Sequence, residues 1–109
     1  MRYYQLNVPV DVGAADQLRG LLLNIAGGYT ELPFTANGGW VDGEGRVAVE
    51  HRNIFQVAAS VSQMQRILRA LHELYPQEKS WLIVNMGEAT FWKPKAPIAS
   101  APEATSNAS

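Results

Sequence analysis

The sequence contains no cysteine among its 109 residues. Disulfides, thiolate metal sites and cysteine nucleophiles are therefore excluded. Long apolar runs are also missing: runs such as 21–23 are far shorter than the roughly 20 residues that a membrane-spanning helix needs. Met1 and Arg2 lead directly into an alternating pattern, with no visible signal peptide, so we expect a cytoplasmic protein without a membrane partner.

Charge is sparse and nearly balanced. Charged residues make up 17% of the chain and the formal net charge is −1. Electrostatic binding to nucleic acid needs clustered Lys and Arg, whereas here only Arg66 and Arg69 lie close together, so we expect no nucleic-acid partner. Two histidines without cysteine argue against a structural zinc site, and we predict no metal or other cofactor.

Hydrophobic periodicity predicts one domain over residues 1–92, in the order βαββαβ. Apolar residues recur at every second position in the expected strands and at helical spacing in the expected helices. The six expected elements are a strand at 4–10, a helix at 11–26, strands at 29–41 and 46–58, a helix at 62–75 and a strand at 80–92. The rest of the chain, residues 93–109, is rich in Pro, Ala, Ser and Thr and is expected to be disordered.

Local signals mark the ends of these elements. Gly27-Gly28 ends the first helix, because glycine readily adopts the left-handed conformation of a C-terminal cap. Asp42–Gly45 is typical of a hairpin turn. Ser62 and Gln65 have the spacing of a capping box ahead of the second helix.

Several positions indicate irregular strands. Pro33 favours an edge strand, since proline donates no ladder hydrogen bond. We expect bulges ahead of Gly38 and near 50–53, where the apolar alternation slips. The last strand is expected to bend at Gly87.

Right-handed crossovers place both helices on one face of a four-stranded antiparallel sheet, which is the ferredoxin-like α+β fold. The other face is then bare, and Tyr3, Trp81 and Ile83, or their strand neighbours, should lie partly in water. A contiguous apolar face on a small protein usually marks an interface. We therefore expect an oligomer, with clefts between subunits in which ligands can bind.

The distinctive residues are Gly27-Gly28-Tyr29-Thr30, then Gly38-Gly39-Trp40, then Glu50-His51. One interpretation is a ligand pocket in which Trp40 offers a stacking face and Glu50 holds a cation or amine. The alternative is structural: the glycines cap a helix and mark a bulge, and Trp40 packs at an interface.

Four other polar residues need interpretation. Glu88 either points into the same cleft or is a solvent-exposed carboxylate. His51 should face away from Glu50 if the strand is regular. His72 is interpreted as a surface residue of the second helix, and Ser60 as a helix cap rather than a nucleophile.

A Gly-Gly-x-Thr helix exit, a Gly-x-Trp strand, Glu50, and Gln77-Glu78 opening the last strand together resemble small PII-like (GlnB-like) proteins of phages. The resemblance covers nearly all of residues 1–92. It implies a trimer that binds nucleotides or related small ligands between subunits, in the host cytoplasm if the chain is phage-encoded. The long loop of PII regulators between the second and third strands is reduced here to the Asp42–Gly45 turn.

A narrower resemblance is to phage S-adenosylmethionine lyases, which share this fold. Trp40 stands where that family has a Tyr, and Glu50 falls near its Glu. An aromatic face with a carboxylate suits a sulfonium cation. Glu50 is then the catalytic candidate, and positioning of the substrate's own carboxylate would supply much of the rate.

Three functions follow as hypotheses. The leading one is binding of an adenosyl- or nucleotide-type ligand in intersubunit clefts of a PII-like oligomer. The others are S-adenosylmethionine cleavage and a non-catalytic protein-interaction module, so enzymatic activity is left open. The predicted ligand-binding residues are Tyr29, Thr30, Gly39, Trp40, Glu50 and Glu88.

Overall fold

The computed structural model describes residues 1–78 and 81–91, and these form the expected βαββαβ order. The elements are β1 (Arg2–Pro9), α1 (Val12–Ala26), β2 (Thr30–Val41), β3 (Val47–Ala59), α2 (Val61–Leu74) and β4 (Ile83–Glu88). The strand β4 is shorter than predicted. Ser80, Trp92 and the tail 93–109 lie outside the described residues.

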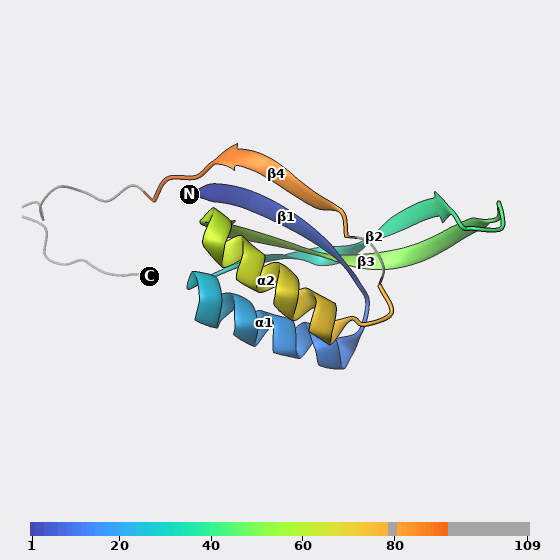
Figure 1. Ribbon diagram of the computed structural model, residues 1–109, viewed down its shortest axis with the longest axis horizontal. Coiled ribbons are helices and arrows are strands. Elements are labelled where there is room, and N and C mark those ends of the chain that lie inside the picture. Colours follow the sequence, from blue (N-terminus) through green and yellow to red (C-terminus); the bar gives the residue numbers. More distant parts are fainter. Residues whose placement is uncertain (79–80, 92–109) are drawn as a thin grey trace, which may run out of the picture.

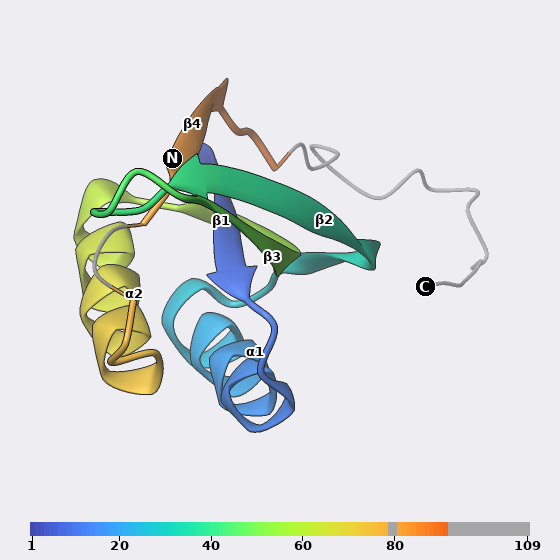
Figure 2. The ribbon, with the colours of Figure 1, turned by 90° about the vertical axis from the view of Figure 1, so that its right-hand side faces the viewer.

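The four strands form one antiparallel sheet in the order β2-β3-β1-β4. Both helices pack on the same face of this sheet, as the edge-on view shows (Figure 2). The two outer strands β2 and β4 are the sheet edges (Figure 1). The predicted ferredoxin-like fold is therefore confirmed.

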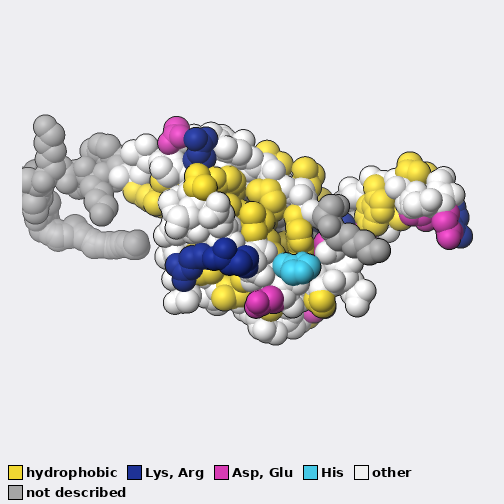
Figure 3. Space-filling model, viewed as in Figure 1, with side chains coloured by type: hydrophobic (Ala, Val, Ile, Leu, Met, Phe, Trp, Pro, Cys, Tyr) yellow, Lys and Arg dark blue, Asp and Glu magenta, His cyan; other side chains and the backbone are white. Residues whose placement is uncertain are grey.

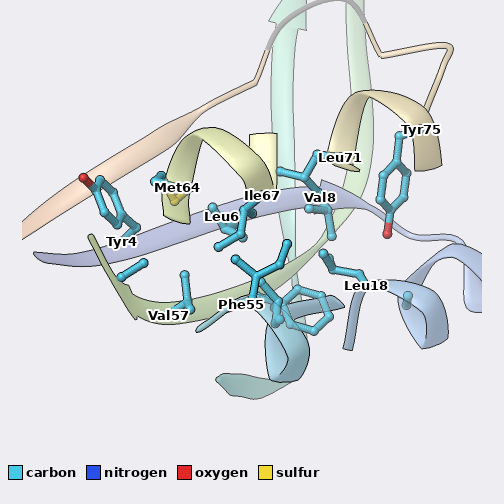
Figure 4. Packing of buried hydrophobic residues seen from close by; sticks show 14 of the residues in the cluster. Tyr4, Leu6, Val8, Leu18, Phe55, Val57, Met64, Ile67, Leu71 and Tyr75 are labelled. Carbon is cyan, nitrogen blue, oxygen red and sulfur yellow. The ribbon is translucent and has the colours of Figure 1, made fainter. Parts of the chain in front are cut away.

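The core lies between the sheet and the helices (Figure 4). Alternate residues of β1 and β3 point toward the helices, and the helices present residues at i, i+3, i+4 spacing in return. Fully buried side chains include Leu6, Val8, Leu18, Leu22, Phe55, Val57, Ile67 and Leu71. Burying each such side chain contributes roughly 1.5–3 kcal/mol. Tyr75 closes the core beside the edge of Trp81, and burial raises the pKa of its hydroxyl to about 12.

The helix ends follow the predicted chemistry, with one correction. Gly27 caps α1 at φ 83°, a left-handed conformation that favours glycine. The capping box of α2 is formed by Ser60 and Gln63, not by Ser62 and Gln65 as predicted. The cap lies two residues earlier because Ser60 has the extended backbone of an N-cap, whereas Ser62 already lies inside the helix.

Of the two bulges predicted between these strands, the one ahead of Gly38 is found and the one near 50–53 is not. The register between β2 and β3 shifts between Glu31 and Thr35, and it is continuous from Thr35 to Val41. The irregularity therefore lies upstream of Gly38, around Pro33, and no shift occurs over 50–53. The bend at Gly87 is confirmed, since β4 carries an extra residue opposite β1 there and Gly87 has φ 107°.

The β2–β3 hairpin extends beyond the rest of the sheet (Figure 1). The strand β1 ends opposite Arg52, so residues 36–51 have no third strand beside them. We call residues 36–51 the arm. The turn at its tip is the predicted one, with Gly45 at φ 82° donating to the Asp42 carbonyl.

The face opposite the helices carries a polar network in its middle. The Tyr3 hydroxyl donates to Gln56, and the Gln56 amide donates to Gln5. The apolar part of this face comes from Val84, paired with Gln5, and its strand neighbours Leu82 and Met86, all exposed. Trp81 and Ile83 pack against the core, so Tyr3 and the strand neighbours Leu82 and Val84 lie on the open face, which is the second of the two predicted possibilities.

Candidate functional site

A cavity of about 650 Å³ lies where the arm meets the segment between α2 and β4. We call it the arm cavity. The arm contributes one wall, and Asn7 of β1 with Gln77, Glu78 and Leu82 contributes the other. Its described lining residues are Asn7, Ala36, Asn37, Gly38, Gly39, Trp40, Arg52, Gln77, Glu78 and Leu82.

Arg52 connects the two walls. One guanidinium nitrogen, Nη1, donates to Glu78 Oε2 at 2.8 Å, and Nη2 lies 2.8 Å from Glu50 Oε1. The side chains of Arg52 and Glu78 are only 15% and 19% exposed. Charge-assisted bonds of this kind are stronger when solvent is excluded. The pair with Glu78 therefore holds the base of the arm against the loop that follows α2.

The indole of Trp40 lies under the guanidinium of Arg52, whose Cζ is 5.4 Å from the ring centroid. This is the geometry of a cation–π contact. Gly38 lies between the two side chains on the same face of the β2–β3 hairpin. The Arg52 side chain crosses Gly38 closely enough that an added Cβ would be 3.7 Å from Cγ. One face of Trp40 is thus occupied, and its side chain is still 41% exposed.

Glu50 is not a free carboxylate. Its Oε1 atom is buried, and its only close cation among the described residues is Arg52. The 2.8 Å contact lacks hydrogen-bond geometry, so no described donor satisfies this atom. Glu50 therefore acts on Arg52 through its charge, while its side chain as a whole remains 41% exposed.

The predicted site residues divide into two groups. Gly39 and Trp40 line the arm cavity, and Glu50 reaches it through Arg52. Tyr29 and Thr30 instead line a smaller cavity of about 240 Å³ near Gln56.

Glu88 lies near the start of β1, opposite Arg2 and 3.8 Å from the Met1 amino group. Its side chain is 72% exposed. Within one copy of the chain, neither Glu88 nor Tyr29 shares a cavity with Trp40.

The histidines stand as predicted. His51 pairs with Asn37 in an unbroken register, so it faces away from Glu50. His72 is exposed at the end of α2. Within 1–78 and 81–91, no group of three or more His, Asp or Glu side chains is arranged to hold a metal ion. No helix in this part of the chain is long and apolar enough to cross a membrane.

Arg52 and Glu78 are the site residues that the sequence interpretation missed. A signal for Arg52 was present, since positions 50 and 52 of a strand share a face and carry opposite charges. Gln77-Glu78 was read as the opening of the last strand, but both residues precede β4 in the loop after Pro76. The loop position is what lets Glu78 reach across to β3.

Solved structures of CutA proteins, one of them described as PII-like, share this four-stranded βαββαβ sheet with two helices. CutA1 from Oryza sativa matches with a TM-score of 0.65 at 12% identity, over 83% of this chain and 81% of that chain. The divalent cation tolerance protein CutA1 from Thermus thermophilus matches with a TM-score of 0.63 at 17% identity, over 83% and 85%. The PII-like protein CutA from Nostoc matches with a TM-score of 0.56 at 20% identity, over 77% and 79%.

These similarities show the fold alone. No protein-family model matches the chain, and no curated protein matches its sequence. The PII-like fold that the sequence resemblance implied is confirmed, since these neighbours are CutA proteins and one of them is itself a PII-like protein. The narrower resemblance to phage S-adenosylmethionine lyases gains no support from the comparisons.

Proposed function

We propose that copies of this chain assemble into a PII-like oligomer, a trimer, whose arm cavities bind a small adenosyl- or nucleotide-type ligand. The observation that carries this proposal is the arm cavity, with Trp40 on its wall. Its volume of about 650 Å³ is within the range of small-molecule sites. An exposed indole face stacks well on a planar heterocycle.

The polar groups of the cavity suit the edges of such a heterocycle. Asn37 and Gln77 each offer a carbonyl oxygen and an amide NH₂. The side-chain amide of Asn7 already donates to the Leu82 carbonyl. Its side-chain oxygen remains as an acceptor for a ligand. Gly38 and Gly39 add no side chain between the ligand and the strand.

Assembly is supported by the apolar surface that one copy leaves in water. On the arm, Val41, Val47 and Val49 are 66%, 74% and 70% exposed. The arm appears as a hydrophobic projection with charged side chains at its tip (Figure 3). A small protein rarely exposes such surface without a partner. A second copy that covers the arm would put the arm cavity at a subunit boundary.

Binding without catalysis is the function that the site favours. A lyase of the suggested kind would need Glu50 near the substrate sulfonium, and here that carboxylate is paired with Arg52. Product analysis of S-adenosylmethionine incubations decides this point. Formation of methylthioadenosine would make the protein an enzyme and would restore Glu50 as the catalytic candidate.

The test is calorimetric titration with adenosine. The wild type should bind, and Trp40→Ala should weaken binding by about ten-fold, as expected for loss of one stacking contact of 1–3 kcal/mol. Phe34→Ala is the matched control, because Phe34 is an exposed aromatic of the same strand outside the cavity lining. Absence of adenosine binding, or equal loss in both variants, would overturn the proposal.

A further inference from the structure

We infer that Glu78 and Glu50 set the charge preference of the arm cavity, so that it selects a heterocyclic ligand carrying a positive group and rejects phosphate esters. This inference rests on the proposed function and names the class of ligand for the same site. It comes from the surroundings of Arg52, which the sequence interpretation did not include.

Arg52 would be expected to attract phosphate if it were free. Guanidinium groups bind phosphate through two parallel N–H bonds at one edge. Here Nη1 is bonded to Glu78 and Nη2 is in contact with Glu50. The Cζ atom of Arg52 lies over the Trp40 ring, 5.4 Å from its centroid. Both terminal nitrogens of the guanidinium are therefore engaged, and the indole ring lies beneath the group.

The charges of this cluster do not balance. One guanidinium faces two carboxylates, which leaves a net charge of −1 among the described groups at the cavity. Glu78 is itself a lining residue. With its side chain 19% exposed, its charge is only partly screened by water. A phosphate entering the cavity would meet repulsion from the carboxylates, whereas a cation would be attracted.

The unsatisfied oxygen of Glu50 adds a second reason. Its Oε1 atom is buried and accepts no hydrogen bond from any described residue. A buried acceptor without a donor is costly. A second anion placed near Arg52 would compete for the same guanidinium and raise that cost, while a positive group would lower it.

The experiment compares matched ligands on the wild-type protein. S-adenosylmethionine and S-adenosylhomocysteine differ by one methyl group and one positive charge, and AMP adds a phosphate to adenosine. Calorimetry should rank S-adenosylmethionine above S-adenosylhomocysteine and adenosine above AMP. Added salt should weaken S-adenosylmethionine binding and strengthen AMP binding, because screening acts oppositely on attraction and repulsion.

Glu78→Gln tests the residue itself. This change removes the charge but keeps the shape and an acceptor oxygen. The preference for S-adenosylmethionine over S-adenosylhomocysteine should fall by about ten-fold, and AMP binding should tighten as Arg52 is released. Glu50→Gln should likewise reduce the preference for S-adenosylmethionine and tighten AMP binding. It replaces Glu78→Gln as the test if Glu78→Gln does not fold. Glu73→Gln, an exposed residue of α2 outside the arm cavity, is the matched control.

The outcomes separate the two proposals. If adenosine does not bind the wild type, the proposed function fails. If adenosine binds but the charged ligands are ranked the other way, or Glu78→Gln leaves the ranking unchanged, only the charge inference fails. Lys79 follows Glu78 in sequence and lies outside the described residues, so the ligand ranking is also measured for Lys79→Gln. A loss of charge preference in that variant alone would also overturn the role given to Glu78.

Discussion

Arg19 on α1 and Glu31 on β2 form a two-point ion pair. Nε lies 2.7 Å from Oε1 and Nη2 lies 3.0 Å from Oε2, while Nη1 bonds Asp16 at 2.6 Å. The bond to Arg19 lowers the pKa of Glu31 below its ordinary value. The pair lies one residue ahead of the register shift in β2, so it anchors the strand to the helix before the arm begins.

This pair predicts a pH dependence of stability. A carboxyl whose pKa is lowered by folding stabilises the native state above its unfolded pKa, about 4.3, and loses that contribution as pH falls. Glu31→Gln should therefore lower the free energy of unfolding at pH 7 by about 1 kcal/mol, a value reduced by partial exposure of both side chains. Urea denaturation at pH 7, 5 and 3 measures this.

The pH dependence is assigned to Glu31 by comparing the stability of the wild type with that of two variants. Between pH 5 and pH 3 the wild type should lose more stability than Glu31→Gln. Glu73→Gln, which removes an exposed carboxylate from α2, should lose as much as the wild type. A pH profile of Glu31→Gln that parallels the wild type would show that the ion pair contributes nothing measurable.

Assembly through the open face gives a second prediction. Val84 is 38% exposed there, between the more exposed Leu82 and Met86. Val84→Glu should convert the oligomer to folded monomers, because an interface cannot readily bury an unpaired charge. Light scattering measures the mass and circular dichroism checks the fold. Val61→Glu, at the first turn of α2 and 57% exposed, is the matched control and should stay oligomeric.

A stable wild-type monomer at micromolar concentration would contradict this prediction at once. So would an unchanged mass for Val84→Glu. A wild-type monomer would leave the exposed valines of the arm without a partner, and the arm cavity would have to bind its ligand within a single copy. An unchanged mass for Val84→Glu would instead exclude Val84 from the interface and leave the arm as the assembly surface.

Residues 93–109 carry the third prediction, which depends on composition alone. Few apolar residues lie in this segment, so its ordering would cost more conformational entropy than burial returns. A chain ending at Lys93 should keep its melting temperature and its oligomeric mass. A fall of several degrees in the melting temperature would instead show that the segment packs on the domain.

The fold could be predicted because its signals are local and repeated. Alternation in β1 and the apolar stripe of α2 each involve several residues, so one misjudged position changes little. The cap of α2 shows the limit of such signals. Ser60 and Ser62 are both acceptable caps with a glutamine three residues on, and only the backbone conformation chooses Ser60.

The site could be predicted only where its residues share a strand pair. Trp40 and Glu50 were grouped because a short hairpin joins β2 and β3, and both lie beside the guanidinium of Arg52. Glu78 could not be added, since it reaches Arg52 across 26 positions from an irregular loop. Tyr29 directly precedes β2 and lies at the opposite end of that strand from Trp40, and Glu88 lies opposite Arg2 at the start of β1, so both are far from the arm within one copy.

The last prediction concerns the separation between the arm cavity and the region that contains Tyr29 and Glu88. Glu88 and Arg52 lie beside opposite ends of β1, which spans about 23 Å at ~3.3 Å per residue. If the ligand binds in the arm cavity of one copy, Glu88→Gln should not alter its affinity. Tyr29→Phe should also bind normally, because it keeps the ring that packs 6.0 Å from Phe55 and removes only the hydroxyl. Both variants should remain folded, since neither polar group supports the core.

Calorimetry of these two variants with adenosine, beside Trp40→Ala, distinguishes where the ligand lies. Loss confined to Trp40→Ala supports a site built by the arm cavity alone. A ten-fold loss in Tyr29→Phe or Glu88→Gln as well would contradict that, because no ligand of adenosine size reaches both regions of one copy. The ligand would then contact the arm of one subunit and the Tyr29 region of its neighbour, as an intersubunit cleft requires.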